Sequence, residues 1–171
     1  MHRYAGHPSL LQRAEALTLI HAGAIQPAVY LAGTRTLRIG ITPNGKTAYV
    51  VNATSDTVTP ISTATNTPRP AINVGQQPVA ITITPNGATA YVANVCCGSG
   101  TVTPINTATN TPGPAINVGQ APVAIAITPN GATAYVANNV SAKVTPISTA
   151  TNTTGPAIQV GKNPEAVAIA P

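Results

Sequence analysis

Few side chains in this sequence are able to transfer protons, attack a substrate or bind a metal. The three histidines, His2, His7 and His21, all lie near the N-terminus. The rest of the chain holds only two acids after residue 15, Asp56 and Glu165, and they are far apart in the sequence. General acid–base catalysis needs such groups held together at one site, and zinc or calcium needs several ligands at once. The sequence therefore predicts no catalytic residue, no cofactor and no metal site, and it predicts Asp56 to be a solvated loop residue.

The two cysteines, Cys96 and Cys97, are adjacent. Adjacent cysteines cannot join distant parts of a fold, so they indicate little about the redox compartment. Two interpretations stay open. The pair forms a strained disulfide that makes this segment a redox-sensitive loop, or it consists of two loop thiols without a function. This possible redox loop is the one candidate site that we take from the sequence.

The charge pattern argues against nucleic acid and against a membrane-spanning helix. Only 6% of the residues are charged, and the net charge of +5 reflects scarce acids more than abundant bases. No cluster of Lys and Arg alternates with aromatic residues, as a nucleic-acid interface would require. No run of 18 or more apolar residues is present, so we predict no transmembrane segment.

The composition indicates strands joined by tight turns. Hydrophobic residues make up 43% of the chain, yet Trp and Phe are absent and the aromatics are five tyrosines. The core must therefore consist of closely packed Val, Ile and Ala. Thr, Asn, Pro and Gly supply much of the remainder, and this mixture of β-branched residues and turn formers is typical of all-β proteins.

Three motifs recur in the same order three times. The first reads Ile-Thr-Pro-Asn-Gly-x-Thr-Ala-Tyr-Val, the second Val-Thr-Pro-Ile-x-Thr-Ala-Thr-Asn-Thr and the third Pro-Ala-Ile-x-Val-Gly. Gly45 and Gly87 are 42 residues apart, and Gly87 and Gly131 are 44 apart. The two extra residues fall around Cys96 and Cys97, which predicts a loop tip there. A fixed period of this length is typical of solenoids and propellers.

Each repeat divides into four strand-like pieces, which the third copy shows best. The Pro129-Asn130-Gly131 segment predicts a type I turn closing into a bulge, and Pro146 predicts a bulge or an unpaired position in the third strand. The four pieces are residues 123–127, 134–137, 143–147 and 157–160. Four short antiparallel strands in each repeat predict a propeller blade. The recurring tyrosines are expected to pack in the core with each hydroxyl reaching a partner at the rim; they are Tyr49, Tyr91 and Tyr135.

These motifs, with the closing Val-Gly-x-x-Pro, resemble the YVTN β-propeller repeat of bacterial and archaeal proteins over about residues 27–171. The naming tetrapeptide departs at one position, because the Thr is replaced by Val51, Ala93 or Ala137. The resemblance implies a propeller, often of seven blades, and frequently a location at the cell surface or outside the cytoplasm. It does not imply one activity.

We therefore predict an all-β, open partial propeller of three four-stranded antiparallel blades. The blades cover about 37–77, 78–121 and 122–163, and single strands at 28–32 and 165–170 belong to neighbouring blades. Closed propellers have about 4–8 blades. A blade face covers roughly 300 Å², so two uncovered faces forgo roughly 15 kcal/mol of burial as an upper bound. The chain is a piece of a longer propeller, or closes by self-association through its open faces, or has its ends covered or tolerated.

Residues 1–26 do not match the repeat and form a separate segment. Ser9 to Gln12 reads as a capping box, which predicts a short amphipathic helix over about 9–22. The alternative is a secretory signal with an apolar part over 16–25 and a cleavage site at Ala22-Gly23-Ala24.

The function that fits these observations is a non-enzymatic module for binding or scaffolding, with a protein as the partner. Loops at the two rims of a propeller carry such functions on a rigid scaffold, and the fold alone names no ligand. Two alternatives stay open. The chain is part of a larger propeller enzyme, such as a lactonase-like hydrolase, whose catalytic residues lie in other blades, or it is a non-functional gene fragment.

Overall fold

The computed structural model describes residues 20–21, 24–25, 36–96 and 98–169, and the chain forms two units, residues 1–31 and 32–171. The described part of the first unit is a pair of antiparallel strands, β1 (Ile20–His21) and β2 (Ala24–Ile25). The predicted helix over about 9–22 is wrong at Ile20 and His21, because these residues pair as a strand. The rest of that helix and the strand predicted at 28–32 lie outside the described residues.

The second unit contains three antiparallel sheets, one for each repeat. The first sheet consists of β3 (Thr36–Ile41), β4 (Thr47–Asn52), β5 (Thr57–Ser62), β6 (Thr67–Pro68) and β7 (Ile72–Asn73). The second consists of β8 (Pro78–Ile83), β9 (Thr89–Cys96), β10 (Ser99–Asn106), β11 (Thr111–Pro112) and β12 (Ile116–Asn117). The third consists of β13 (Pro122–Ile127), β14 (Thr133–Asn138), β15 (Lys143–Ser148), β16 (Thr153–Thr154) and β17 (Ile158–Gln159).

The Pro-Asn-Gly turns join the first two strands of each sheet as predicted. In the first sheet the Gly45 amide donates to the Thr42 carbonyl at 2.7 Å, and Gly45 has φ of 69°. The Asn44 carboxamide oxygen accepts from the Thr42 hydroxyl and from the Lys46 amide. Glycine is required at the last turn position because other residues rarely adopt positive φ, and the asparagine fixes the turn through its side chain.

The fourth strand of each sheet is divided into two short strands, a division that the sequence did not predict. In the first sheet β6 and β7 both pair with β5, and one extra residue lies between the two registers. The Arg69 amide donates to the Pro60 carbonyl. In an antiparallel strand the N–H and C=O of one residue point to the same side, so the missing N–H of Pro60 faces this outer strand and interrupts it. The bulge therefore lies opposite the proline, while Pro60 itself stays in register with Tyr49.

The two extra residues of the second repeat lengthen a hairpin. Strands β9 and β10 are 8 residues long, whereas β4 and β5 are 6 residues long. The register adds Ser99↔Cys96 and Gly100↔Val95 beyond the Thr101↔Asn94 pair. The insertion therefore lies at a hairpin tip, in agreement with the prediction, and leaves the rest of the sheet unchanged.

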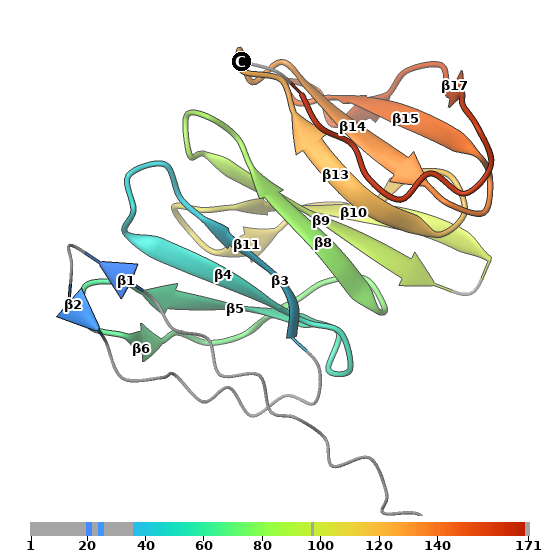
Figure 1. Cartoon of the computed structure of the whole chain (residues 1–171). Coiled ribbons are helices and arrows are strands. Elements are labelled where there is room, and N and C mark those ends of the chain that lie inside the picture. The colour runs from blue at the N-terminus through green and yellow to red at the C-terminus, as the bar shows by residue number, and fades with distance from the viewer. Residues whose placement is uncertain (1–19, 22–23, 26–35, 97, 170–171) are drawn as a thin grey trace, which may run out of the picture. The chain divides into compact units, whose positions relative to one another are not determined.

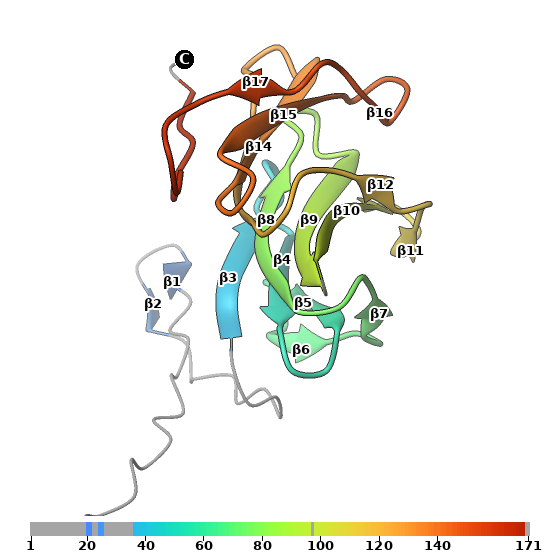
Figure 2. The ribbon, with the colours of Figure 1, turned by 90° about the vertical axis from the view of Figure 1, so that its right-hand side faces the viewer.

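The three sheets lie side by side in a propeller-like arrangement that does not close (Figure 1). The first strand of each sheet is innermost, and β8 contacts both β3 and β13. Figure 2 shows β3 and β8 on one side of this unit and the short outer strands β7, β11 and β12 on the other. All described residues that belong to a regular element are in strands. Residues 164–169, where a further strand was expected, belong to no sheet.

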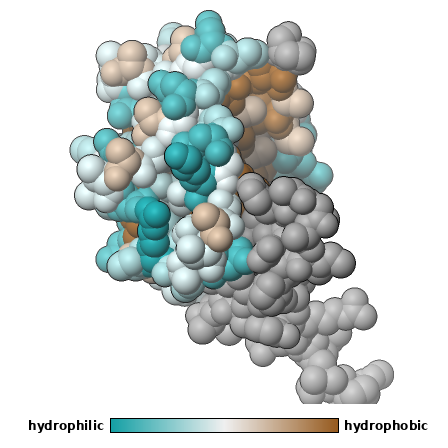
Figure 3. Space-filling model, turned by 90° about the vertical axis from the view of Figure 1, so that its left-hand side faces the viewer, coloured by the Kyte–Doolittle hydropathy of each residue, from teal (hydrophilic) through white to brown (hydrophobic). Residues whose placement is uncertain are grey.

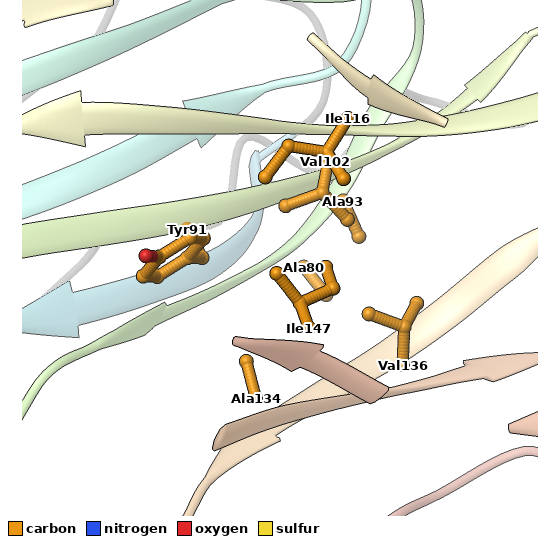
Figure 4. Packing of buried hydrophobic residues seen from close by; sticks show 8 residues of the cluster. All are labelled: Ala80, Tyr91, Ala93, Val102, Ile116, Ala134, Val136 and Ile147. Carbon is orange, nitrogen blue, oxygen red and sulfur yellow. The ribbon is translucent and has the colours of Figure 1, made fainter. Parts of the chain in front are cut away.

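In the described part of the chain, two clusters of buried hydrophobic residues each fill the space between neighbouring sheets. Between the first and second sheets, Tyr49, Val58 and Ile72 pack against Ala90, Val92 and Ile105. Figure 4 shows the equivalent cluster between the second and third sheets, with Tyr91, Val102 and Ile116 on one side and Ala134, Val136 and Ile147 on the other. Small and branched side chains interdigitate here without large rings apart from the tyrosines, as the composition predicted.

Candidate functional site

The described residues that are able to do acid–base chemistry lie in separate elements. His2 and His7 lie outside the described residues, and His21 is part of β1. Asp56 follows β4, and Glu165 lies in the irregular segment after β17. Within the described ranges no group of three or more His, Cys, Asp or Glu residues is arranged to hold a metal ion.

Asp56 lies in the turn between β4 and β5, as expected of a loop residue, and in addition has a backbone partner. Its carboxylate accepts a hydrogen bond of 2.7 Å from the Gln77 amide, and the Val74 amide donates to its backbone carbonyl. Asp56 has φ of 56°, a conformation that aspartate tolerates better than most residues. It therefore ties the turn between β4 and β5 to the chain that leads into β8.

The possible redox loop cannot be assembled from described groups. Cys96 ends β9, and Cys97 lies outside the described residues. The interpretation of the pair as a redox-sensitive loop or as two loop thiols stays a prediction.

The hydroxyls of Tyr49 and Tyr91 each link one sheet to a turn of the next. Tyr49 donates to the Asn110 carboxamide oxygen at 2.7 Å, with the Thr107 carbonyl at 3.3 Å. Tyr91 donates to the Asn152 carboxamide oxygen at 2.7 Å in the same way. Both asparagines have positive φ, 56° and 57°. The prediction of buried tyrosines with a rim partner is thus confirmed for Tyr49 and Tyr91.

Burial also changes the acidity of these hydroxyl groups. Burial raises the pKa of Tyr49, and the charge of Arg69 lowers it in part. Burial raises the pKa of Tyr91 as well. A raised pKa keeps both hydroxyls protonated, so they act as hydrogen-bond donors and not as bases at neutral pH.

The third sheet carries the same three residue positions, and no sheet of the described residues packs against them. Val144 pairs with Ile158 as Val58 pairs with Ile72. Ile72 is 5% exposed, Ile116 is 8% exposed and Ile158 is 48% exposed. Tyr135 and Val144 are partly exposed, whereas Tyr49 and Val58 are fully buried. Among the described residues the Tyr135 hydroxyl has no asparagine partner. We call the surface formed by Tyr135, Val144 and Ile158 the open face.

Close packing of a glycine against a buried asparagine is a second link between the sheets. A Cβ atom added to Gly75 would lie 2.7 Å from Cγ of Asn94, and one added to Gly119 would lie 2.7 Å from Cγ of Asn138. Both asparagines are fully buried. The Asn138 amide nitrogen donates to the Thr145 hydroxyl, which holds the side chain in place across its own sheet. The third motif of the repeat therefore ends in glycine because an asparagine of the next sheet occupies the space.

Three buried polar atoms near these contacts have no hydrogen-bond partner among the described residues. They are the carboxamide oxygens of Asn94 and Asn138 and the hydroxyl of Ser141. The oxygen of Asn138 and the Ser141 hydroxyl both lie on side chains that crowd Gly119.

Two clefts lie between neighbouring sheets. One has a volume of about 400 Å³ and lies between the outer strand of the first sheet and the turn before β11; its lining includes Arg69, Asn73, Thr109 and Asn110. The other has a volume of about 470 Å³, and its lining includes Ser99, Gly119, Ser141 and Lys143. Both are open, with mixed polar and apolar linings, and each contains one cationic side chain.

The surface is otherwise weakly charged. Figure 3 shows a face that is largely polar or neutral in hydropathy, with apolar surface gathered toward one edge. The large hydrophobic residues with high exposure are Ile41, Val140 and Ile158. No helix that could cross a bilayer occurs in the described part of the chain.

Two features of the site were missed from the sequence although the repeat contained a signal for each. The asparagine that accepts from the tyrosine recurs as Asn66, Asn110 and Asn152, one per repeat. Arg69 stands where the other repeats have Gly113 and Gly155. Alignment of the three copies makes both visible, but only the structure places them in contact with another sheet.

No protein-family model and no curated protein sequence matches this chain. Among solved structures, hydrazine synthase of Kuenenia stuttgartiensis is similar, with 28% identity, a TM-score of 0.71 and coverage of 81% of this chain and 42% of that chain. A 6-phosphogluconolactonase-like protein of Bacteroides fragilis is similar in fold, with 21% identity, a TM-score of 0.68 and coverage of 81% and 43%. The chain thus spans less than half the length of these two proteins, and the likeness supports a β-propeller-like fold.

Proposed function

We propose that this chain is a non-enzymatic binding and scaffolding part of a β-propeller, and that its open face receives a further blade of the same repeat type. The observation that carries this proposal is the contrast between Ile158, which is 48% exposed, and Ile72 and Ile116, which are 5% and 8% exposed. The three residues occupy the same place in their sheets.

The chemistry of the occupant follows from the two interfaces already formed. In both, the Tyr, Val and Ile of one sheet meet an Ala, Val and Ile surface of the next, and a turn asparagine accepts from the tyrosine. The open face presents the Tyr, Val and Ile side of this arrangement. Its complement is a sheet with an Ala, Val and Ile surface and an asparagine of positive φ in the turn before its fourth strand.

The size of the open face favours a blade of the same propeller over a separate molecule. A blade face covers roughly 300 Å², so two facing blades bury roughly 600 Å². A stable interface between separate proteins buries about 1,200–2,000 Å². A blade that is covalently linked needs no such area, because neighbouring repeats stabilise each other along the chain.

An extended chain tests this proposal. Residues 164–171 match the start of a repeat, so a second copy of residues 130–163 added after Pro171 completes a fourth repeat. We expect a higher midpoint of chemical unfolding. We also expect Ile158→Ala to lower the free energy of unfolding by about 2–4 kcal/mol in the extended chain and by less than about 1 kcal/mol in the 171-residue chain. The reason is that the substitution leaves a cavity only where an added blade buries the isoleucine.

The control for this experiment is an extended chain in which one asparagine of the added copy, the copy of Asn152, is replaced by glycine. This change should remove the tyrosine contact and part of the added stability, on the order of 1 kcal/mol. An extended chain that is no more stable than the original, with an unchanged cost of Ile158→Ala, would contradict the proposal.

The alternative is that the chain forms part of a propeller enzyme. The names of the two similar structures favour this alternative. Under our proposal the chain itself does not accelerate the hydrolysis of 6-phosphogluconolactone above the uncatalysed rate. A stopped-flow measurement of acid release checks this result, with buffer as the control. A rate that scales with protein concentration and is lost on unfolding would instead establish an enzyme.

A further inference from the structure

We propose that the cleft containing Arg69 binds a carboxylate group. The cleft has a volume of about 400 Å³ and lies between the first and second sheets. Volumes of about 300–1,000 Å³ are usual for small-molecule sites. The inference is independent of whether a further blade covers the open face, because no residue of the open face lines this cleft.

Arg69 differs from the residue that the other two repeats have at the same position. Its side chain is exposed and lines a cleft together with residues of the next sheet. The other two repeats have Gly113 and Gly155 here, and the backbone amide of each makes the same hydrogen bond to a proline carbonyl. The fold therefore needs no arginine at this position. The first repeat alone places a guanidinium at this position, in the wall of the cleft.

No carboxylate neutralises this guanidinium from within the cleft. The residues that line it with Arg69 are Pro70, Ala71, Ile72, Asn73, Thr109, Asn110 and Pro112. All of them are neutral. The positive charge of Arg69 also lowers the pKa of the buried Tyr49 hydroxyl against the effect of burial.

The opposite wall of the cleft is the turn before β11. Hydrogen bonds hold this turn in place, and it offers a hydrogen-bond donor to a ligand. The Tyr49 hydroxyl binds the oxygen end of the Asn110 carboxamide at 2.7 Å. The donor end of Asn110, its amide nitrogen, is the end left to a ligand. The Asn106 carboxamide oxygen accepts from the Ala108 and Thr109 amides and fixes this turn. A fixed amide donor that lines the same cleft as a guanidinium is complementary to a carboxylate, which accepts through two oxygens in one plane.

The matched probes are succinate, a blocked peptide with one glutamate and the same peptide with glutamine in its place. Binding to the ¹⁵N-labelled chain is followed through the Arg69 side-chain N–H, the Asn110 amide group and the Thr109 backbone N–H. We expect saturable shifts with succinate and with the glutamate peptide, and none with the glutamine peptide. Tighter binding of the peptide than of succinate would identify a protein segment as the source of the carboxylate, and the reverse would identify a small organic acid.

The variants separate a site from general attraction to a positive charge. Arg69→Gln should weaken binding at least tenfold, and Arg69→Lys several-fold, because lysine keeps the charge but lacks the planar pair of donors. Lys46→Gln removes an exposed charge outside the cleft and should leave binding unchanged. Equal binding by all three variants, or shifts of the same size with inorganic phosphate or chloride, would overturn the proposal.

Discussion

Replacing Gly119 with alanine is expected to destabilise the protein by about 2–3 kcal/mol, because overpacking of a closely filled contact is costly. The added Cβ atom would lie 2.4 Å from the Ser141 hydroxyl oxygen and 2.7 Å from Cγ of Asn138. Asn138 is fully buried and bonded to the Thr145 hydroxyl. It cannot move away without loss of that bond, so the collision separates the second and third sheets. Urea unfolding of the variant measures the loss.

Gly161 is the matched control for this substitution. It ends the same motif in the third repeat, and a Cβ atom added there meets no atom within 4 Å. Gly161→Ala should change the free energy of unfolding by less than about 0.5 kcal/mol. Gly75→Ala, which meets Asn94 at 2.7 Å, should behave like Gly119→Ala. Equal effects at Gly119 and Gly161 would show that the asparagine contact does not determine the cost.

Ile116→Ala is expected to cost about 2–4 kcal/mol, because it leaves a cavity in the cluster between the second and third sheets. Ile116 is 8% exposed and lies beside Val102 in the cluster that also contains Tyr91 (Figure 4). Ile158→Ala removes the same atoms from the same place in the third sheet. It should cost less than about 1 kcal/mol, since half-exposed atoms lose little burial and leave no cavity.

Denaturant unfolding of the two variants side by side, with the original chain as reference, provides this comparison. The free energy of unfolding should fall with denaturant concentration at the same slope in all three proteins, so that they differ only in the midpoint of unfolding. A large loss at Ile158 in the 171-residue chain would mean that the open face is already covered in solution. The premise that it is free to receive a blade would then fail.

The sequence predicted the parts of the fold that depend on contacts within one repeat. The Pro-Asn-Gly turns, the apolar first strands and the order of four strand positions all follow from turn chemistry and residue alternation, and the structure has them. The division of the outer strand was not predicted. The proline pattern suggested an irregularity in the third strand, but the missing N–H of Pro60 faces the neighbouring strand, and the bulge appears there.

The candidate sites were less predictable because they depend on contacts between repeats. Tyr49 reaches Asn110, and Gly75 meets Asn94, across a sheet boundary that no periodicity describes. The redox loop proposed for Cys96 and Cys97 rests on chemistry that adjacent cysteines allow, and it stays a prediction. The sequence indicates the Arg69 cleft only through the arginine itself, which stands where the other repeats have Gly113 and Gly155. The volume and lining of the cleft depend on how two sheets pack against each other.

The lengthened β9–β10 hairpin makes this position suitable for protein engineering. The natural insertion added rungs beyond Thr101↔Asn94 and kept that pair in the register of Asn52↔Thr57 in the first sheet. Side chains alternate between the two faces of a strand, so further residues added in equal steps to both arms preserve which side chains point inward. An epitope tag or a reporter peptide grafted at this tip would project from the scaffold without disturbing the contacts that hold the repeats together.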